Sequence, residues 1–137
     1  MLVELVRVPL VPATGGGILK VLNRESYLFQ DFGELYFSQI SKEFFRGWKI
    51  HTKLQSLLFV IEGVISLHVI HPDSSCETIT LEKITDSNTI VKIPPGIPFG
   101  FKSLSSHATI GNFASLMHDP SEVERPSLHF HECEWLA

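Results

Sequence analysis

The sequence is short of cysteine. It contains two cysteines in 137 residues, Cys76 and Cys133, and they lie far apart and form no CxxC pair. A disulfide framework or a CxxC redox motif is therefore not indicated. The pattern predicts two reduced thiols in a cytoplasmic protein.

Long apolar runs and an excess of basic charge are also lacking. The apolar stretch "MLVELVRVPLVPAT" is too short for a signal peptide or a membrane span, and it is also interrupted by Glu4, Arg7, Pro9 and Pro12. The net charge of -4 and the pI of about 5.9 argue against a general nucleic-acid or membrane-surface binder. We therefore expect no nucleic-acid and no membrane partner. An anionic small ligand held by a few local cations is still compatible with this net charge.

Helical periodicity, internal repeats and linkers are absent as well. Short apolar runs rich in β-branched and aromatic residues recur instead, with Gly, Pro, Asp and Ser clusters between them. The length fits one domain, 1–137. An all-β sandwich or barrel is therefore predicted, with strands at 35–40, 57–70, 77–81, 89–93 and 108–116.

Two local signals add detail to this pattern. Gly63 divides the run 57–70 and predicts a tight turn with positive φ, after which His68 is expected to face out of the sheet. In "HDPSEVERP", Asp119 is expected to cap a short helix whose capping box is completed by Glu122.

Four segments, in this order, resemble the dTDP-4-dehydrorhamnose 3,5-epimerase-like family of the cupin superfamily. They are "GELYFSQISKEFFRGWKIH", "FVIEGVISLHV", "IPPGIPFGFKSL" and "NFASLMHDPSEVERP", and the resemblance extends from Gly33 to Trp135. It implies a cupin double-stranded β-helix (jelly-roll) barrel, with a core at about 33–117 and a C-terminal extension at 118–137. It also implies a homodimer that binds a nucleotide-linked sugar in its mouth, and proton transfer next to a ketone without a metal or an organic cofactor.

The metal site of many cupins is not retained. Those cupins use two histidines one residue apart, a glutamate, and a third histidine after a PxG turn. The matching positions here are Lys49, His51, Gln55 or Ser56, and Phe99. One conventional ligand does not make a transition-metal site, so no metal is expected there.

A second cluster lies near the C-terminus. In "LHFHEC", an extended chain would place His129, His131 and Cys133 on one face. A lone strand gives poor tetrahedral geometry, so we expect these to be polar residues on the outer face of a terminal strand.

The acid–base residues of the epimerases are also replaced. By the resemblance, Lys49 stands at the position of the catalytic base, Ser56 at that of the enolate-stabilising lysine, and Asn112 at that of the tyrosine acid. Arg46 is retained and is expected to hold the nucleotide's phosphates, which suits a bidentate cation.

A different set of residues can still carry the chemistry. Alternation on a strand places Lys49 and His51 on the same side, and two neighbouring cations in a partly dry barrel lower each other's pKa. Either is then a candidate base at neutral pH. "KIHTKLQ" also resembles a segment of the cupin 3,4-ketoisomerases of dTDP-sugars, which favours His51. The expected site has His51, Lys49 and Tyr36 as catalytic residues and, as substrate-binding residues, Arg46, Gln55, Ser56, Phe99 and Asn112.

Three functions stay open on this basis. The first is an epimerase or isomerase that acts on a dTDP-4-keto-6-deoxy sugar in polysaccharide or deoxysugar synthesis. The second is a sugar or nucleotide-sugar binding cupin that has lost the acid–base residues, and the third is a 3,4-ketoisomerase. A metal-dependent cupin is disfavoured by the ligand count.

Overall fold

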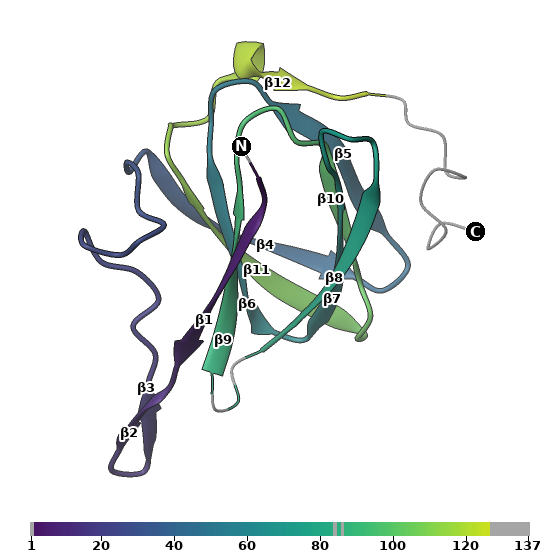
Figure 1. Cartoon of the computed structure of the whole chain (residues 1–137). Coiled ribbons are helices and arrows are strands. Elements are labelled where there is room, and N and C mark those ends of the chain that lie inside the picture. Colours follow the sequence, from purple (N-terminus) through teal and green to yellow (C-terminus); the bar gives the residue numbers. More distant parts are fainter. Residues whose placement is uncertain (1, 84, 86, 127–137) are drawn as a thin grey trace.

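Two five-stranded antiparallel sheets pack face to face and form the body of the molecule (Figure 1). The computed structural model describes residues 2–83, 85 and 87–126. The first sheet has the order β1-β9-β6-β11-β4, that is Glu4–Pro9, Ser87–Ile93, Ser56–Glu62, His107–Ala114 and Glu34–Ser41. The second has the order β12-β5-β10-β7-β8, that is Val123–Glu124, Phe45–His51, Phe99–Ser103, Val64–Ile70 and Cys76–Glu82.

The strands follow from alternation between apolar and polar side chains. In β4, Ile40 points into the core between the sheets while its neighbours Gln39 and Ser41 are exposed. The main core takes Val60 from the first sheet and Leu67 from the second, both fully buried. The predicted all-β cupin architecture is confirmed.

All five predicted strands are present, with β6 and β7 divided at Gly63. Gly63 has φ +80°, and a Cβ there would lie 2.5 Å from the carbonyl oxygen of His107. Glycine is therefore required both by the turn conformation and by the close approach of the two chains. The sequence did not indicate β1 or β10. β1 and β12 also show that both sheets take a strand from outside the range 33–117.

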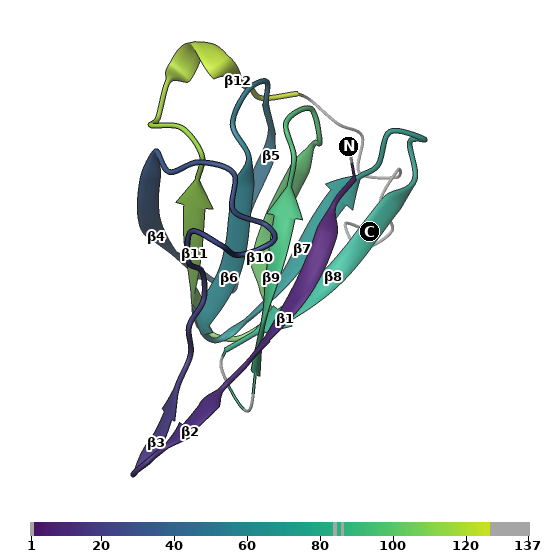
Figure 2. The ribbon, with the colours of Figure 1, turned by 60° about the vertical axis from the view of Figure 1, so that its left-hand side comes forward.

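A two-stranded hairpin lies apart from both sheets. β2 (Val11–Ala13) pairs with β3 (Gly16–Ile18), and every residue of the two strands is exposed. Figures 1 and 2 both show it projecting from one end of the barrel, opposite the end that carries β12. The segment 19–33 then runs back over the outer face of the first sheet, where Leu28 joins a second apolar cluster with Phe59.

His68 lies on the predicted face of β7, opposite the core; it is 0% exposed there and contacts Ser66 and Thr78 through its two ring nitrogens. The expectation for Cys76 is wrong. Cys76 is disulfide-bonded rather than a reduced thiol. His129, His131 and Cys133 lie outside the described residues.

The predicted short helix near the C-terminus is a single 3-10 turn, Pro120–Glu122 (η1). Asp119 caps it as expected, because its carboxylate accepts from the backbone N–H of Ser121 at 3.0 Å. The expected capping box is wrong. Glu122 is 3% exposed and its side chain turns away from the cap, toward β5. In the part of the chain that the structure describes, no helix is long and apolar enough to cross a membrane.

Candidate functional site

Two adjoining cavities open at the end of the barrel that carries β12. The outer cavity has a volume of about 310 Å³ and is lined by Glu34, Tyr36, His51, Leu54, Ala114 and His118. The inner cavity lies between the sheets, has a volume of about 90 Å³, and includes Tyr36, Arg46, Lys49, Phe99 and Asn112 in its lining. Tyr36 lines both cavities, so we treat them as one site with a mouth and a floor.

A bulge in β5 brings two cations to the floor of this site. Lys49 pairs with Phe99 of β10, whereas Arg46 pairs with Phe101. Between these two pairs β5 therefore contains one residue more than β10, which is a β-bulge. Gly47 sits at this point with φ +150°, and a Cβ there would lie 2.6 Å from Cα of Gly100. Because of the bulge, Arg46 and Lys49 both line the inner cavity although they are three residues apart.

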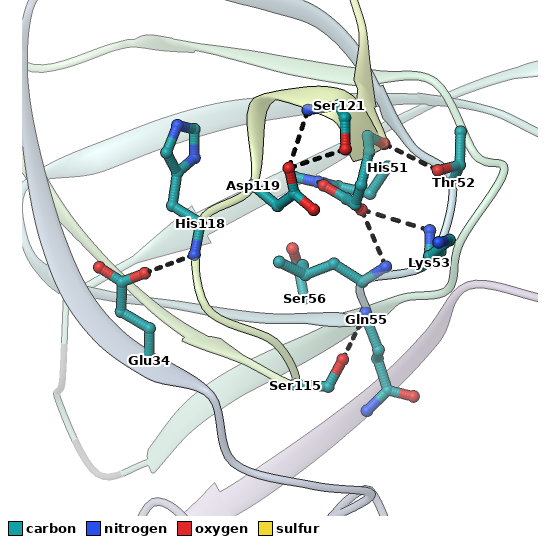
Figure 3. A network of polar contacts seen from close by, with 12 residues as sticks. Glu34, His51, Thr52, Lys53, Gln55, Ser56, Ser115, His118, Asp119 and Ser121 are labelled. Atoms are coloured by element: carbon teal, nitrogen blue, oxygen red, sulfur yellow. Dashed lines mark hydrogen bonds and ion pairs between the residues drawn. The ribbon is translucent and has the colours of Figure 1, made fainter.

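His51, the last residue of β5, is held by a carboxylate from η1. Its Nδ1 lies 2.8 Å from Oε2 of Glu122. The other carboxylate oxygen of Glu122 accepts from the backbone N–H groups of Leu54 at 2.9 Å and Lys53 at 3.3 Å (Figure 3). Thr52 binds the same turn, because its hydroxyl donates to the Glu122 carbonyl. The turn is therefore fixed against β5 from both sides.

This pairing sets the chemical state of the imidazole. A carboxylate at Nδ1 keeps the proton on that nitrogen, which leaves the lone pair of the neutral ring on Nε2. Nε2 is buried and has no hydrogen-bond partner among the described residues. Burial lowers the pKa of His51, and the Glu122 carboxylate opposes this only in part. His51 is thus neutral at physiological pH, and its side chain lines the outer cavity.

Glu122 is ionised in this pairing. Burial alone raises the pKa of its carboxyl, but the hydrogen bonds from His51, Leu54 and Lys53 together outweigh burial, and the net pKa is lowered.

The wall opposite the second sheet carries a chain of hydrogen bonds to Tyr36. The side-chain amide of Asn112, on β11, donates to the Tyr36 hydroxyl at 2.8 Å and lies 3.4 Å from Oγ of Ser56. Because the Tyr36 oxygen accepts from Asn112, its own proton is left for a partner in the cavity. Burial raises the pKa of Tyr36 and so keeps the phenol protonated at neutral pH.

Two cations, Arg46 and Lys49, line the floor, and the charge of a third, the exposed Arg125, acts on Lys49. Burial lowers the pKa of Lys49, and the charges of Arg125 and Arg46 lower it further. Lys49 Nζ lies 5.3 Å from the centre of the Phe99 ring, a cation–π contact. Among the described residues, no ion pair involves Arg46, Lys49 or Arg125. This arrangement favours an anion.

Most of the residues expected from the sequence meet here. Tyr36, Arg46, Lys49, Phe99 and Asn112 line the inner cavity, His51 lines the outer one, and Ser56 is fully buried behind Asn112. Gln55 lies elsewhere, because its side-chain amide donates to the carbonyl of Leu28 on the outer side of the sheet and it lines neither cavity. Its expected role in substrate binding has no support in this geometry.

Four residues of the site were not expected from the sequence. Glu34 and His118 line the outer cavity, and the backbone N–H of His118 donates to the Glu34 carboxylate at 3.0 Å (Figure 3). Glu122 is the last residue of η1, and Arg125 follows β12; neither lines a cavity, but Glu122 contacts His51 and the charge of Arg125 acts on Lys49. Glu122 did carry a signal in the sequence, a carboxylate three residues after a helix cap, but the pattern pointed to the cap and not to His51.

The donor atoms of the site do not match a transition-metal centre. The described residues include no group of three His, Cys, Asp or Glu side chains placed to hold a metal ion. The neighbours of the His51 ring are the Glu122 carboxylate and the Phe99 ring, the latter with its centre 6.0 Å away.

A scan against protein-family models finds no match for this sequence, and a search of curated proteins finds none either. Solved structures do match. A dTDP sugar isomerase from Desulfovibrio desulfuricans G20 is 26% identical with a TM-score of 0.82, and the match covers 95% of this chain and 87% of that one.

Two more distant structures have the same fold. The 3,4-ketoisomerase QdtA from Thermoanaerobacterium thermosaccharolyticum, in complex with TDP-4-keto-6-deoxyglucose, is 19% identical with a TM-score of 0.78, over 92% of this chain and 90% of that one. The 3,5-epimerase RmlC from Legionella pneumophila, in complex with dTDP-4-keto-L-rhamnose, is 16% identical with a TM-score of 0.79, over 95% of this chain and 75% of that one.

The two packed sheets with a polar site at one end of the barrel define a cupin. More particularly, the chain shares its fold with RmlC-like cupins, among which are the dTDP sugar isomerase and the 3,5-epimerase named above.

Proposed function

We propose that this protein is a sugar-nucleotide isomerase that moves a proton next to the ketone of a dTDP-4-keto-6-deoxy sugar. The observation that carries the proposal is the pair formed by His51 and Glu122. It supplies one buried, neutral, oriented base, which lines the same cavity as a protonated tyrosine and whose Nε2 has no hydrogen-bond partner among the described residues. The named activities of the structural relatives agree with it.

Proton abstraction falls to His51 in this mechanism. Nε2 accepts the hydrogen on the sugar carbon beside the ketone, and the electron pair of that C–H bond moves toward the carbonyl and forms an enediolate. The resulting imidazolium is stabilised by the Glu122 carboxylate at Nδ1. A positioned base of this kind contributes roughly 10²–10⁴-fold to the rate.

Tyr36 provides the proton for the oxygen that gains charge. Its phenol can donate to the former ketone oxygen and recover a proton from the neighbouring hydroxyl, which exchanges the ketone between C4 and C3. His51 then returns its proton to C4. The bonds balance, since C3–H and O3–H are lost while C4–H and O4–H are formed, and no other reactant is required.

Among the reactions open to this family, 3,4-ketoisomerisation fits the site best. It needs one base that serves two adjacent carbons, and the described site offers one such base with a free nitrogen. Inversion at C3 and C5 requires an acid on the opposite face of the sugar for each centre. Asn112, at the position of the epimerase acid, cannot donate a proton in that way.

The cations of the floor account for the nucleotide part of the substrate. The charges of Arg46 and Arg125 act on Lys49, and the three have no ion-pair partner within the described part of the chain. A guanidinium binds phosphate oxygens in pairs. We assign the diphosphate to these residues. A homodimer in the cytoplasm, acting in deoxysugar or polysaccharide synthesis, stays part of the proposal.

The test is proton NMR of the protein with dTDP-4-keto-6-deoxyglucose in deuterium oxide. A 3,4-ketoisomerase exchanges the proton at C3 and gives a 3-keto product that carries deuterium at C4. Exchange at both C3 and C5 would instead identify a 3,5-epimerase. Line broadening of the nucleotide without any exchange would mean a binding protein and would overturn the proposal of catalysis.

His51→Gln tests the base directly. The expected loss of exchange is at least 10²-fold, with nucleotide binding retained. The chain offers a matched control in His107→Gln, because His107 also pairs with a glutamate, Glu62, at 3.0 Å, but is exposed and lines neither cavity of the site. Equal activity of the two variants would exclude His51 as the base.

A further inference from the structure

Asn112 belongs to the wall of the inner cavity. In the register of the first sheet it pairs with Tyr36 of β4 on one side and with Leu58 of β6 on the other, and all three residues line this cavity. β11 lies between those two strands, and Asn112 is 3% exposed. The sheet therefore holds this side chain in a fixed place within the site.

The two polar atoms of the Asn112 amide are in different situations. Nδ2 donates to the Tyr36 hydroxyl at 2.8 Å and lies 3.4 Å from Oγ of Ser56. Oδ1 is buried and accepts no hydrogen bond from any residue that the structure describes. Buried acceptors are as a rule supplied with a donor, so an exception in the wall of a ligand cavity calls for an explanation.

The other polar side chains of the inner cavity do not supply this donor. Besides Tyr36 and Asn112, the groups with N–H or O–H bonds that line it are Ser38, Arg46 and Lys49, and none of the three donates to Oδ1. Lys49 Nζ is placed over the Phe99 ring, 5.3 Å from its centre. The missing donor is therefore left to a bound molecule.

Tyr36 and Asn112 together present a donor beside an acceptor. Because the Tyr36 oxygen accepts from Nδ2, the phenol can donate its own proton, and Oδ1 belongs to the same amide as that Nδ2. A ketone oxygen can accept from the phenol, while a hydroxyl on the next carbon can donate to Oδ1. This pair of groups is complementary to an α-hydroxy ketone, in which an acceptor and a donor lie on adjacent carbons.

We propose that Asn112 is a specificity-determining residue that accepts a hydrogen bond from the sugar hydroxyl next to the ketone, which is O3–H in a 4-keto sugar. This role rests on the proposed function, and it narrows the substrates to sugars with a hydroxyl beside the ketone. A 4-keto sugar with a CH₂ group at C3 leaves Oδ1 unpaired. A site built to hydrogen-bond a hydroxyl rejects the analogue that lacks it.

An amide suits this position better than a carboxylate or an apolar side chain. A carboxylate only accepts, so it would take the Tyr36 proton and leave the ketone without a donor. An apolar side chain would give a partner neither to Tyr36 nor to the sugar hydroxyl. The amide donates to Tyr36 through Nδ2 and leaves Oδ1 for the substrate, so both sugar oxygens are recognised.

Competition binding with two sugars tests this role. The ligands are dTDP-4-keto-6-deoxyglucose and its 3-deoxy analogue, and the parent protein carries His51→Gln so that neither sugar is consumed. The parent is expected to bind the analogue roughly 10-fold more weakly or worse. After Asn112→Leu the two sugars should bind within about 3-fold of each other. The contact with Tyr36 is lost for both sugars alike, so it cancels in this ratio.

Asn88→Leu is the matched control. Asn88 is also 3% exposed, its Nδ2 donates to the carbonyl of Val60 at 2.8 Å, and its Oδ1 likewise has no partner among the described residues. It lines neither cavity of the site, so this variant should keep the ratio of the parent. Asn112→Asp, which keeps an acceptor, should also retain the preference for the hydroxylated sugar. Circular dichroism establishes that each variant is folded.

The outcomes separate this role from the proposed function. Equal binding of the two sugars by the parent, or a preference that survives Asn112→Leu, would overturn the role of Asn112. Either result would leave the proposed function standing, because its test is the exchange of the proton at C3. If neither sugar binds to the parent, both proposals are wrong.

Discussion

At the scale of single residues, the decisive contact joins His51 to Glu122 across 71 positions of the sequence. His51 could be chosen from the sequence, because alternation on a strand placed it and Lys49 on one face. Glu122 could not, because it reaches His51 only when η1 folds over the end of β5. The local pattern around Asp119 predicts the same backbone turn in either case, so no short-range signal distinguishes a capping carboxylate from one that contacts His51.

Glu122→Gln should separate orientation from basicity. The Glu122 charge and hydrogen bond both raise the pKa of His51. Their loss lowers that pKa, so the acidic limb of the pH–rate profile should move to lower pH. The plateau rate should nevertheless fall, by roughly 10–10³-fold, since the base is weaker and its imidazolium is no longer stabilised. Measurements of kcat/KM from pH 4 to 9 give both readouts, and a reduced plateau with an unmoved limb would indicate a merely structural role.

Tyr36→Phe tests the proton donor at the same scale. Removal of the hydroxyl takes away the nearer acceptor of the Asn112 amide, leaves it Ser56 Oγ at 3.4 Å, and keeps the ring in place. If Tyr36 moves the proton between the two sugar oxygens, deuterium exchange at C3 should persist while the 3-keto product is formed at least 10-fold more slowly. Loss of exchange and of product to the same extent would mean that Tyr36 acts on the first step as well.

At the scale of elements, β5 shows what a sequence pattern can and cannot give. Regular alternation correctly places Lys49 and His51 together, but it would put Arg46 on the other face. The bulge at Gly47 shifts the alternation of side chains by one residue, so that Arg46 also lines the cavity. A glycine in a strand is compatible with a bulge, a turn or a close contact, and only the register against β10 decides among these.

The cation cluster spans two elements, β5 and the segment after β12, and each should contribute to nucleotide affinity. Arg46→Gln and Arg125→Gln should each weaken dTDP binding about 10-fold, since a hydrogen bond to a charged group is worth roughly 1.5–3 kcal/mol. Isothermal titration at two salt concentrations should show a smaller salt dependence for both variants. Arg24→Gln is the control, because Arg24 is exposed on segment 19–33. Unchanged dTDP affinity in the Arg46 variant would refute the assignment of the diphosphate to the floor of the site.

At the scale of the whole molecule, the sequence predicted the architecture well because strand periodicity and turn residues determine it. Strand periodicity did not reveal the role of the N-terminal segment that precedes these strands. β1 and the β2–β3 hairpin were hidden in an apolar N-terminal stretch, whose role depends on pairing with β9 more than 70 positions away. Long-range pairing of this kind leaves no local pattern to read.

Stability of the whole chain should fall as the pH is lowered from 6.5. Burial lowers the pKa of His68 from 6.5 to about 3 and also lowers that of His51. A histidine whose pKa is depressed by folding stabilises the folded state fully above its unfolded pKa, and this contribution is lost as the pH falls toward its folded pKa. Between pH 6.5 and pH 4, His68 alone should cost on the order of 3 kcal/mol of the free energy of unfolding.

The sign of this effect can be checked with His68→Gln. At pH 7 the variant should be less stable than the wild type, because it loses packing and the hydrogen bonds to Ser66 and Thr78. Since the variant has no proton to take up at this position, the difference should shrink or reverse by pH 4. Urea unfolding at fixed protein concentration measures it. His107→Gln is the control, because the His107 side chain is 64% exposed rather than buried. A stability difference between His68→Gln and the wild type that stays constant from pH 7 to pH 4 would refute the argument.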